Sequence, residues 1–133
     1  MQKFALITGG SSGIGFQIAK KLARKKYSVI ITGRNPIKLQ KAADNLRSFC
    51  DTDIDAFCSD TTDEESLKKV FLEIKAKKGG LDMLILNAGS VSTKLISEYT
   101  NTKELKREID INLWGTVLAT YIFLPLLNKG AKI

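Results

Sequence analysis

The sequence contains no histidine, and it has only two cysteines and two prolines. Histidine is the commonest transition-metal ligand and the usual general base near neutral pH, so many metal and catalytic sites are excluded by its absence. Cys50 and Cys58 do not have the spacing of a metal-binding cluster. We therefore expect a reduced, cytoplasmic protein without a structural metal.

Long hydrophobic runs are missing as well. A membrane-spanning helix needs about 20 predominantly apolar residues, whereas Thr120 and Tyr121 interrupt the longest apolar run, residues 117–127. No signal peptide is visible, because the first expected strand begins almost at Met1. We expect no membrane span. The 133 residues, 44% of them hydrophobic, are enough for one domain over 1–133.

Acidic residues are scarce in the first part of the chain. Residues 1–50 contain ten Lys or Arg and one acid, Asp44, whereas residues 51–133 contain eleven Lys or Arg and thirteen acids. This excess favours a polyanionic ligand such as a phosphorylated dinucleotide, although a solvated helix face is the better explanation for the cluster at residues 20–26. No basic motif with interleaved aromatic residues accompanies the charge, so we expect no nucleic-acid partner.

A glycine-rich turn separates an apolar strand from an amphipathic helix. The segment Thr8-Gly-Gly-Ser-Ser-Gly-Ile-Gly15 directly follows the apolar residues 4–7. Gly9, Gly13 and Gly15 permit a turn with positive φ, a close approach of a ligand and close packing of the helix on the strand. The spacing is one residue longer than the common dinucleotide fingerprint and is not a Walker loop, so a turn without a ligand stays an alternative.

The same turn offers polar groups to an anion. Ser11 and Ser12 can cap the helix or donate hydrogen bonds. A helix that starts near Gly13 or Ile14 aims free N–H groups and the positive end of its dipole at the turn. A pyrophosphate is therefore the ligand that this turn fits best.

Strand and helix patterns alternate along the chain. We expect strands at residues 4–7, 28–33, 54–59 and 81–86, and helices at 14–26, from Pro36, from about Thr62 to Gly79, and from about Thr102 into the 120s. The alternation predicts an α/β fold with a Rossmann-type doubly wound parallel sheet, whose first four strands are the ones given above.

Several residues mark the helix ends. Asn35 and Pro36 are typical of an N-cap and a first helical residue, and Thr62 with Glu65 is typical of a capping box. Gly79 should end the third helix, and Pro125 should kink or end the long one.

Polar residues follow each expected strand. Ligands of such sheets bind at the carboxyl ends of the strands. The candidate ligand residues at these ends are Gly9, Ser11, Ser12, Gly13, Ile14, Gly15, Arg34, Asp60, Thr61, Asn87, Ala88 and Gly89. Each is also explicable as a cap, turn or surface residue, but their joint placement favours one ligand site.

Arg34 indicates which dinucleotide binds. A site for NAD usually has an acid about 20 residues after the glycine turn, which accepts hydrogen bonds from the ribose 2′-hydroxyl. Here that position is Arg34, and the next acid is Asp44. A guanidinium can hold a 2′-phosphate in bidentate fashion, so we expect NADP(H) as the cofactor, with a solvated charge as the alternative.

These residues resemble the amino-terminal half of the short-chain dehydrogenase/reductase superfamily. The matching motifs are Thr8-Gly-Gly-Ser-Ser-Gly-Ile-Gly15, Asp60, Leu86-Asn-Ala-Gly89 and Asp110-Ile-Asn-Leu-Trp-Gly115. The resemblance implies the strand order 3-2-1-4 plus the start of a fifth strand. It also implies that the glycine turn holds the pyrophosphate and that Asp60 contacts the adenine. It also implies that Asn87-Ala88-Gly89 shape the site beside the nicotinamide and that Asn112 supports the family's proton relay. More loosely, the chain is similar to the hydroxysteroid dehydrogenase-like and ketosphinganine reductase-like branches.

The family's remaining catalytic residues, a serine and a Tyr-x-x-x-Lys motif, follow its fifth strand, which should begin here at residues 130–133. Two interpretations stay open. The chain is the NADP(H)-binding portion of an oxidoreductase that moves a hydride between NADP(H) and a small carbonyl or alcohol substrate. Alternatively, it is a non-catalytic dinucleotide-binding or interaction module that is complete at 133 residues.

The chain does contain one sequence of the form Tyr-x-x-x-Lys, at Tyr99 and Lys103, with Ser97 beside it. It precedes Asn112 and lies in the loop before the long helix, so we do not expect it to be catalytic.

Without a complete fifth strand, the fourth strand should be an unprotected edge. The long helix should lose cover too, and we expect a homo-oligomer through residues 102–128.

Overall fold

Five parallel strands form one sheet in the order β3-β2-β1-β4-β5. This arrangement comes from a computed structural model that describes residues 1–133. The strands are β1 (Lys3–Thr8), β2 (Tyr27–Gly33), β3 (Ile54–Cys58), β4 (Leu81–Leu86) and β5 (Leu127–Lys132). The helices are α1 (Gly13–Arg24), α2 (Pro36–Arg47), α3 (Glu64–Lys78), α4 (Thr102–Ile109) and α5 (Gly115–Phe123). The predicted doubly wound parallel α/β fold is confirmed.

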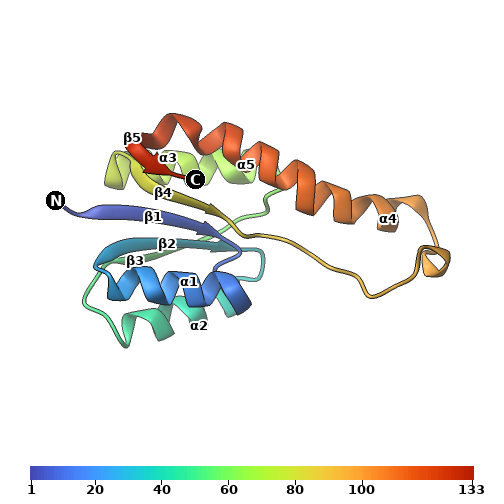
Figure 1. Cartoon of the computed structure of the whole chain (residues 1–133), viewed down its shortest axis with the longest axis horizontal. Coiled ribbons are helices and arrows are strands. Elements are labelled where there is room, and N and C mark those ends of the chain that lie inside the picture. Colours follow the sequence, from blue (N-terminus) through green and yellow to red (C-terminus); the bar gives the residue numbers. More distant parts are fainter.

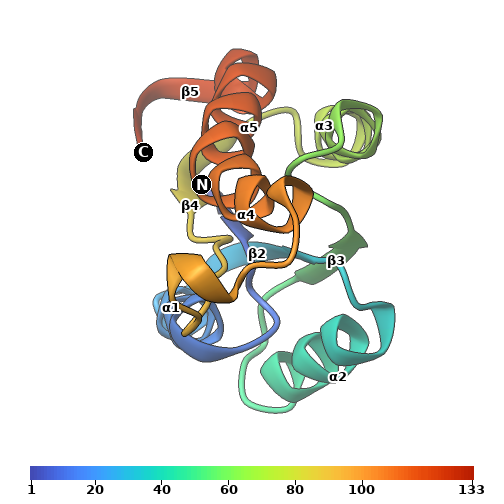
Figure 2. The ribbon, with the colours of Figure 1, turned by 90° about the vertical axis from the view of Figure 1, so that its right-hand side faces the viewer.

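Helices cover both faces of the sheet (Figures 1 and 2), with α1 and α2 on one face and α3 and α5 on the other. Side chains of a strand point alternately to the two faces. Ala5 and Ile7 of β1 accordingly lie in the core with α1 and α2, whereas Leu6 lies in the core with α3 and α5. Both faces of the central strands are therefore buried, which explains their continuous apolar sequences.

The helix ends follow the capping residues, with one correction. The Asn35 side chain accepts hydrogen bonds from the N–H groups of Ile37 and Lys38, both at 3.0 Å, as predicted. Asp63, and not Thr62, caps α3, because its carboxylate accepts from the N–H of Glu65 at 3.0 Å. Thr62 instead donates to Asp60, so the predicted capping box is wrong by one residue.

The fifth strand begins at Leu127, three residues before the predicted Gly130. Pro125 ends the long helix in the 3₁₀ turn η3 (Leu124–Leu126), and the chain turns directly into an extended conformation. β5 pairs with β4 at Leu81 and Met83, with an irregular register between them. The expected unprotected edge at β4 is therefore wrong, and β5 is the edge of the sheet.

The long helix is continuous but not uniform. Between α4 and α5 lies a π-helical turn, η2 (Asp110–Trp114), which the sequence patterns did not predict. α5 buries Leu118, Ile122 and Phe123, whereas α4 buries no residue. In Figure 1, α4 extends beyond the carboxyl ends of the strands.

The same helix bears on the expected absence of a membrane span. Residues Thr102–Leu126 form one helix that is long and apolar enough to cross a membrane, judged by length and composition alone. That expectation rested on uninterrupted apolar runs and overlooked this helix as a whole, so it is not confirmed. Within the fold, the helix packs by its α5 part against β4 and α3.

Candidate functional site

A cavity of about 320 Å³ lies at the carboxyl ends of the first four strands. Nine residues of the predicted ligand set line it: Gly9, Ser11, Ser12, Arg34, Asp60, Thr61, Asn87, Ala88 and Gly89. Five further residues complete the lining: Gly33, Asn35, Lys38, Ser59 and Ile111. The structure thus brings together segments that follow four different strands, as parallel winding requires.

The glycine turn depends on two kinds of constraint. Gly9 and Gly13 have positive φ, +67° and +54°, a backbone conformation that costs other residues about 1–2 kcal/mol. A Cβ on Gly15 would collide with the carbonyl oxygen of Gly9 and with the side-chain nitrogen of Asn87. Gly15 is therefore buried behind the turn and permits the close packing of α1, and it does not line the cavity.

The start of α1 keeps polar groups available. Ser12 is its N-cap residue, but the Ser12 side chain makes no capping hydrogen bond. The hydroxyl is thus free to bind an anion at the positive end of the helix dipole. Ile14 is 74% exposed, and Gly13 and Ile14 line a shallow depression beside α1 and not the main cavity.

A buried hydroxyl locks the turn to the end of β4. Thr8 is 1% exposed, and its Oγ1 accepts hydrogen bonds from the N–H groups of Asn87 and Ala88, both at 3.1 Å. The Asn87 Nδ2 donates to the carbonyl oxygens of Thr8 at 3.2 Å and Gly9 at 3.0 Å. Asn87 therefore acts on the shape of the turn. No role for the Thr8 side chain was predicted from the sequence.

Cationic and polar groups follow β2. Arg34 is exposed, and Lys38 lies one helical turn further on, in the first turn of α2. Both side chains line the cavity, and neither forms an ion pair. Lys38 was not predicted as a ligand residue; its place in the first turn of the helix that Asn35 and Pro36 open, directly after Arg34, was the available signal.

Asp60 is held as a carboxylate. Its Oδ1 accepts hydrogen bonds from the Thr62 N–H at 2.9 Å and from the Thr62 hydroxyl at 2.8 Å. Partial burial opposes ionisation, but these bonds and the charges of Arg34 and Arg107 outweigh it and lower the pKa of Asp60 below its ordinary value. Asp60 is therefore an ionised hydrogen-bond acceptor at neutral pH.

Asn112 lies in the π-helical turn and does not line the cavity. Its side-chain amide makes two hydrogen bonds with the backbone of Ser90: Oδ1 accepts from the N–H at 2.7 Å, and Nδ2 donates to the carbonyl at 2.6 Å. Asn112 thereby fixes the chain directly after Gly89. Single π-helical turns are frequent at functional sites.

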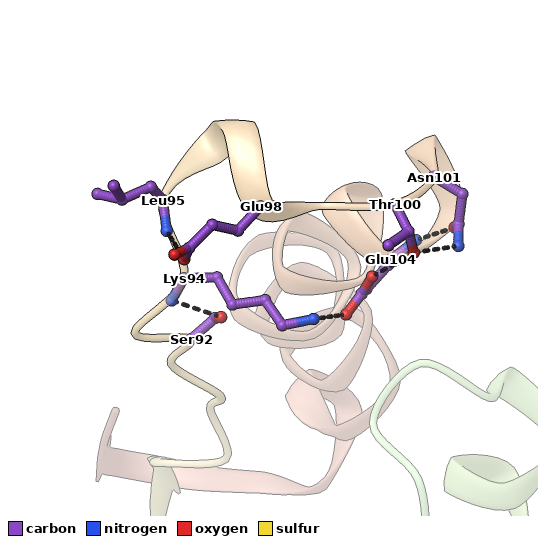
Figure 3. A network of polar contacts seen from close by, with 7 residues as sticks. All are labelled: Ser92, Lys94, Leu95, Glu98, Thr100, Asn101 and Glu104. Carbon is purple, nitrogen blue, oxygen red and sulfur yellow. Dashed lines mark hydrogen bonds and ion pairs between the residues drawn. The ribbon is translucent and has the colours of Figure 1, made fainter.

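Figure 3 shows the polar contacts that attach the segment after Ser90 to α4. Lys94 forms an ion pair with Glu104, in which the ammonium donates a hydrogen bond to the carboxylate. This hydrogen bond is the main cause of the lowered pKa of Glu104 and of the raised pKa of Lys94. Glu98 accepts from the N–H of Leu95 at 2.7 Å. Tyr99 lies outside the 320 Å³ cavity, with its ring 5.6 Å from the Lys94 ammonium.

Fold and cavity together define a Rossmann-type protein whose glycine turn and strand ends face one cleft. The profile of the short chain dehydrogenase family matches residues 3–133, so this chain belongs to that family. The chain is 34% identical over 128 residues to 11-beta-hydroxysteroid dehydrogenase-like 2 of Arabidopsis thaliana, covering 96% of this chain and 42% of that protein.

Solved structures share the fold. An alcohol dehydrogenase from the archaeon Thermococcus sibiricus, complexed with 5-hydroxy-NADP, has a TM-score of 0.89 at 29% identity, over 98% of this chain and 55% of that one. L-sorbose reductase from Gluconobacter frateurii, complexed with NADPH and L-sorbose, has a TM-score of 0.82 at 27% identity, over 93% and 47%. The chain thus spans about half the length of these relatives, or less.

Proposed function

We propose that residues 1–133 are the NADP(H)-binding portion of a short-chain dehydrogenase/reductase. In the complete enzyme a hydride passes between NADP(H) and a small carbonyl or alcohol substrate. The observation that carries the proposal is that one cavity is lined both by the glycine turn before α1 and by the cations Arg34 and Lys38. A dinucleotide with an extra phosphate requires these two features together.

The lining fits such a cofactor. A Cβ at Gly9 would lie 2.9 Å from the Ala88 Cα, so only glycine lets the turn lie this close to the end of β4. We assign the pyrophosphate to the turn from Gly9 to Gly15, with Ser11, Ser12 and the first N–H groups of α1 as donors. We assign the nicotinamide side to Asn87, Ala88 and Gly89. When bound, NADP(H) would supply or accept the hydride.

The adenosine end is assigned to the segments after β2 and β3. Asp60 would accept a hydrogen bond from the adenine amino group, with the buried Thr61 beside it. Arg34 and Lys38 would bind the 2′-phosphate. The complexes of two structural relatives with NADPH and 5-hydroxy-NADP support this choice of cofactor.

Asn112 is assigned a supporting role in catalysis. Its two hydrogen bonds to Ser90 position the chain beside the proposed nicotinamide site. Both polar atoms of the side-chain amide are engaged in these bonds, so the amide acts through the backbone of Ser90. We therefore assign Asn112 the role of positioning the proton relay.

Calorimetric titration of the chain with NADPH and NADH tests the cofactor. Loss of charge-assisted hydrogen bonds to a phosphate costs about 1.5–3 kcal/mol, so NADPH should bind at least about tenfold more tightly than NADH. Arg34→Asp should remove or reverse this preference. Arg24→Asp, the same change at an exposed cation in the last turn of α1, should preserve it. Equal binding of both cofactors by the wild type, or no binding of either, would overturn the proposal.

We further propose that the chain self-associates through the long helix, which ends at Leu126 and not at the expected residue 128, and that it acts in the cytoplasm. Ile109, Leu113, Val117 and Tyr121 follow one another at helical spacing, and each is about half exposed or more, from 48% to 74%. A second copy would cover this apolar stripe.

A further inference from the structure

A second cavity, of about 500 Å³, adjoins the proposed cofactor cavity. The two share Arg34, Asp60 and Ile111 in their lining, and the second extends from these residues along α4 to Lys103, Arg107 and Trp114. Nothing in the proposed binding of NADP(H) uses the part along α4.

The charges around this cavity do not balance. Lys106 and Asp110 neutralise each other, because the Lys106 ammonium lies 2.7 Å from the Asp110 carboxylate. Arg34, Lys103 and Arg107 form no ion pair, and Asp60 is the one remaining acid of the lining. Three cations therefore face one carboxylate, whose oxygen is already engaged by Thr62.

The rest of the lining is Thr62 and two apolar side chains, Ile111 and Trp114. Trp114 is 50% exposed, and its neighbour Ile111 is 7% exposed. Guanidinium groups bind phosphate groups well, because they give bidentate hydrogen bonds, and the indole of Trp114 beside them offers an apolar surface to the body of a ligand.

We infer that this second cavity is a binding site for a phosphate-bearing anion, held by Arg107, Lys103 and Arg34 against Trp114. The phosphate is either free or carried on a small organic body. If the proposed cofactor site is correct, the anion also competes with the 2′-phosphate of NADP(H) for Arg34. The anion then weakens the binding of NADPH more than the binding of NADH. By linkage, bound NADPH weakens the binding of the anion.

Trp114 is the one tryptophan of the chain, so its fluorescence reports on this cavity. The test is a titration with pyrophosphate and, in parallel, with ribose 5-phosphate, at an ionic strength held constant with NaCl. We expect the fluorescence of Trp114 in the wild type to change saturably with at least one of the two compounds. The compound that binds more tightly shows whether the site prefers a free phosphate or a phosphate carried on an organic body. Lys103→Gln with Arg107→Gln should weaken this response at least tenfold.

The matched control is Arg24→Gln with Lys25→Gln, which removes the same two charge types from exposed positions at the end of α1 and should leave the response unchanged. No saturable change with either ligand in the wild type, or an equal response after loss of Lys103 and Arg107, overturns the inference. Failure of NADPH to bind, with this response intact, would count against the proposed function alone.

Discussion

Removing the hydroxyl of Thr8 should destabilise the protein strongly although the side chain keeps its shape. In Thr8→Val the N–H groups of Asn87 and Ala88, each 3.1 Å from Oγ1, lose their acceptor. An unsatisfied buried N–H costs about 1–3 kcal/mol. We expect the free energy of unfolding to fall by about 2–4 kcal/mol, a large part of the total for a domain of this size.

Thr32→Val is the matched control. Thr32 is equally buried, at 1% exposed. Its backbone carbonyl accepts a hydrogen bond from the Gly10 N–H, but its hydroxyl makes no hydrogen bond. Its replacement should leave the free energy of unfolding unchanged or raise it slightly, because no hydrogen bond of the hydroxyl is lost. Urea unfolding followed by far-UV circular dichroism measures both variants. Equal losses for the two would refute the account of Thr8 as the link between the turn and β4.

Four further variants test other parts of the account. Gly15→Ala should lower the free energy of unfolding by about 3 kcal/mol, because the added Cβ collides with the backbone. Gly13→Ala, whose Cβ meets nothing within 4 Å, should lower it by about 1 kcal/mol because of the positive φ. Urea midpoints in the reverse order would contradict this. The lowered pKa of Asp60 means that its stabilising contribution is present above the ordinary carboxylate pKa, about 4, and is lost as pH falls through the lower folded value. Asp60→Asn should therefore lose less stability than the wild type on acidification, and identical acid dependence of the two urea midpoints would count against it. Leu113→Lys with Val117→Lys should give a monomer by light scattering, while a monomeric wild type would show that the exposed stripe is no interface.

Most of the fold could be predicted because it follows from local patterns. β4 covers the residues that its apolar run predicts, and Asn35 caps α2 as its residue type indicates. One error arose where two neighbouring residues can do the same task. Both Thr62 and Asp63 are good N-caps, and the sequence does not show that Thr62 is needed by Asp60.

The position of the cavity was predictable, but the contacts that shape it were not. Parallel winding brings the strand ends together, so residues such as Arg34 and Asp60 could be placed by counting strands. The bond between Thr8 and Asn87 joins residues 79 positions apart, and no periodic pattern reports such a pair. The π-helical turn around Asn112 was likewise invisible, because one extra residue in a turn barely alters the apolar periodicity.

The most direct test of the central claim is to follow the backbone amide resonances of the isotope-labelled chain during titration with NADPH. The account predicts saturable shifts at the glycine turn from Gly9 to Gly15, at Arg34 and at Asp60, with little change at the end of α1 or in β5. Shifts confined to other surfaces, or none at saturating NADPH, would contradict the claim that the cavity at the strand ends is the cofactor site.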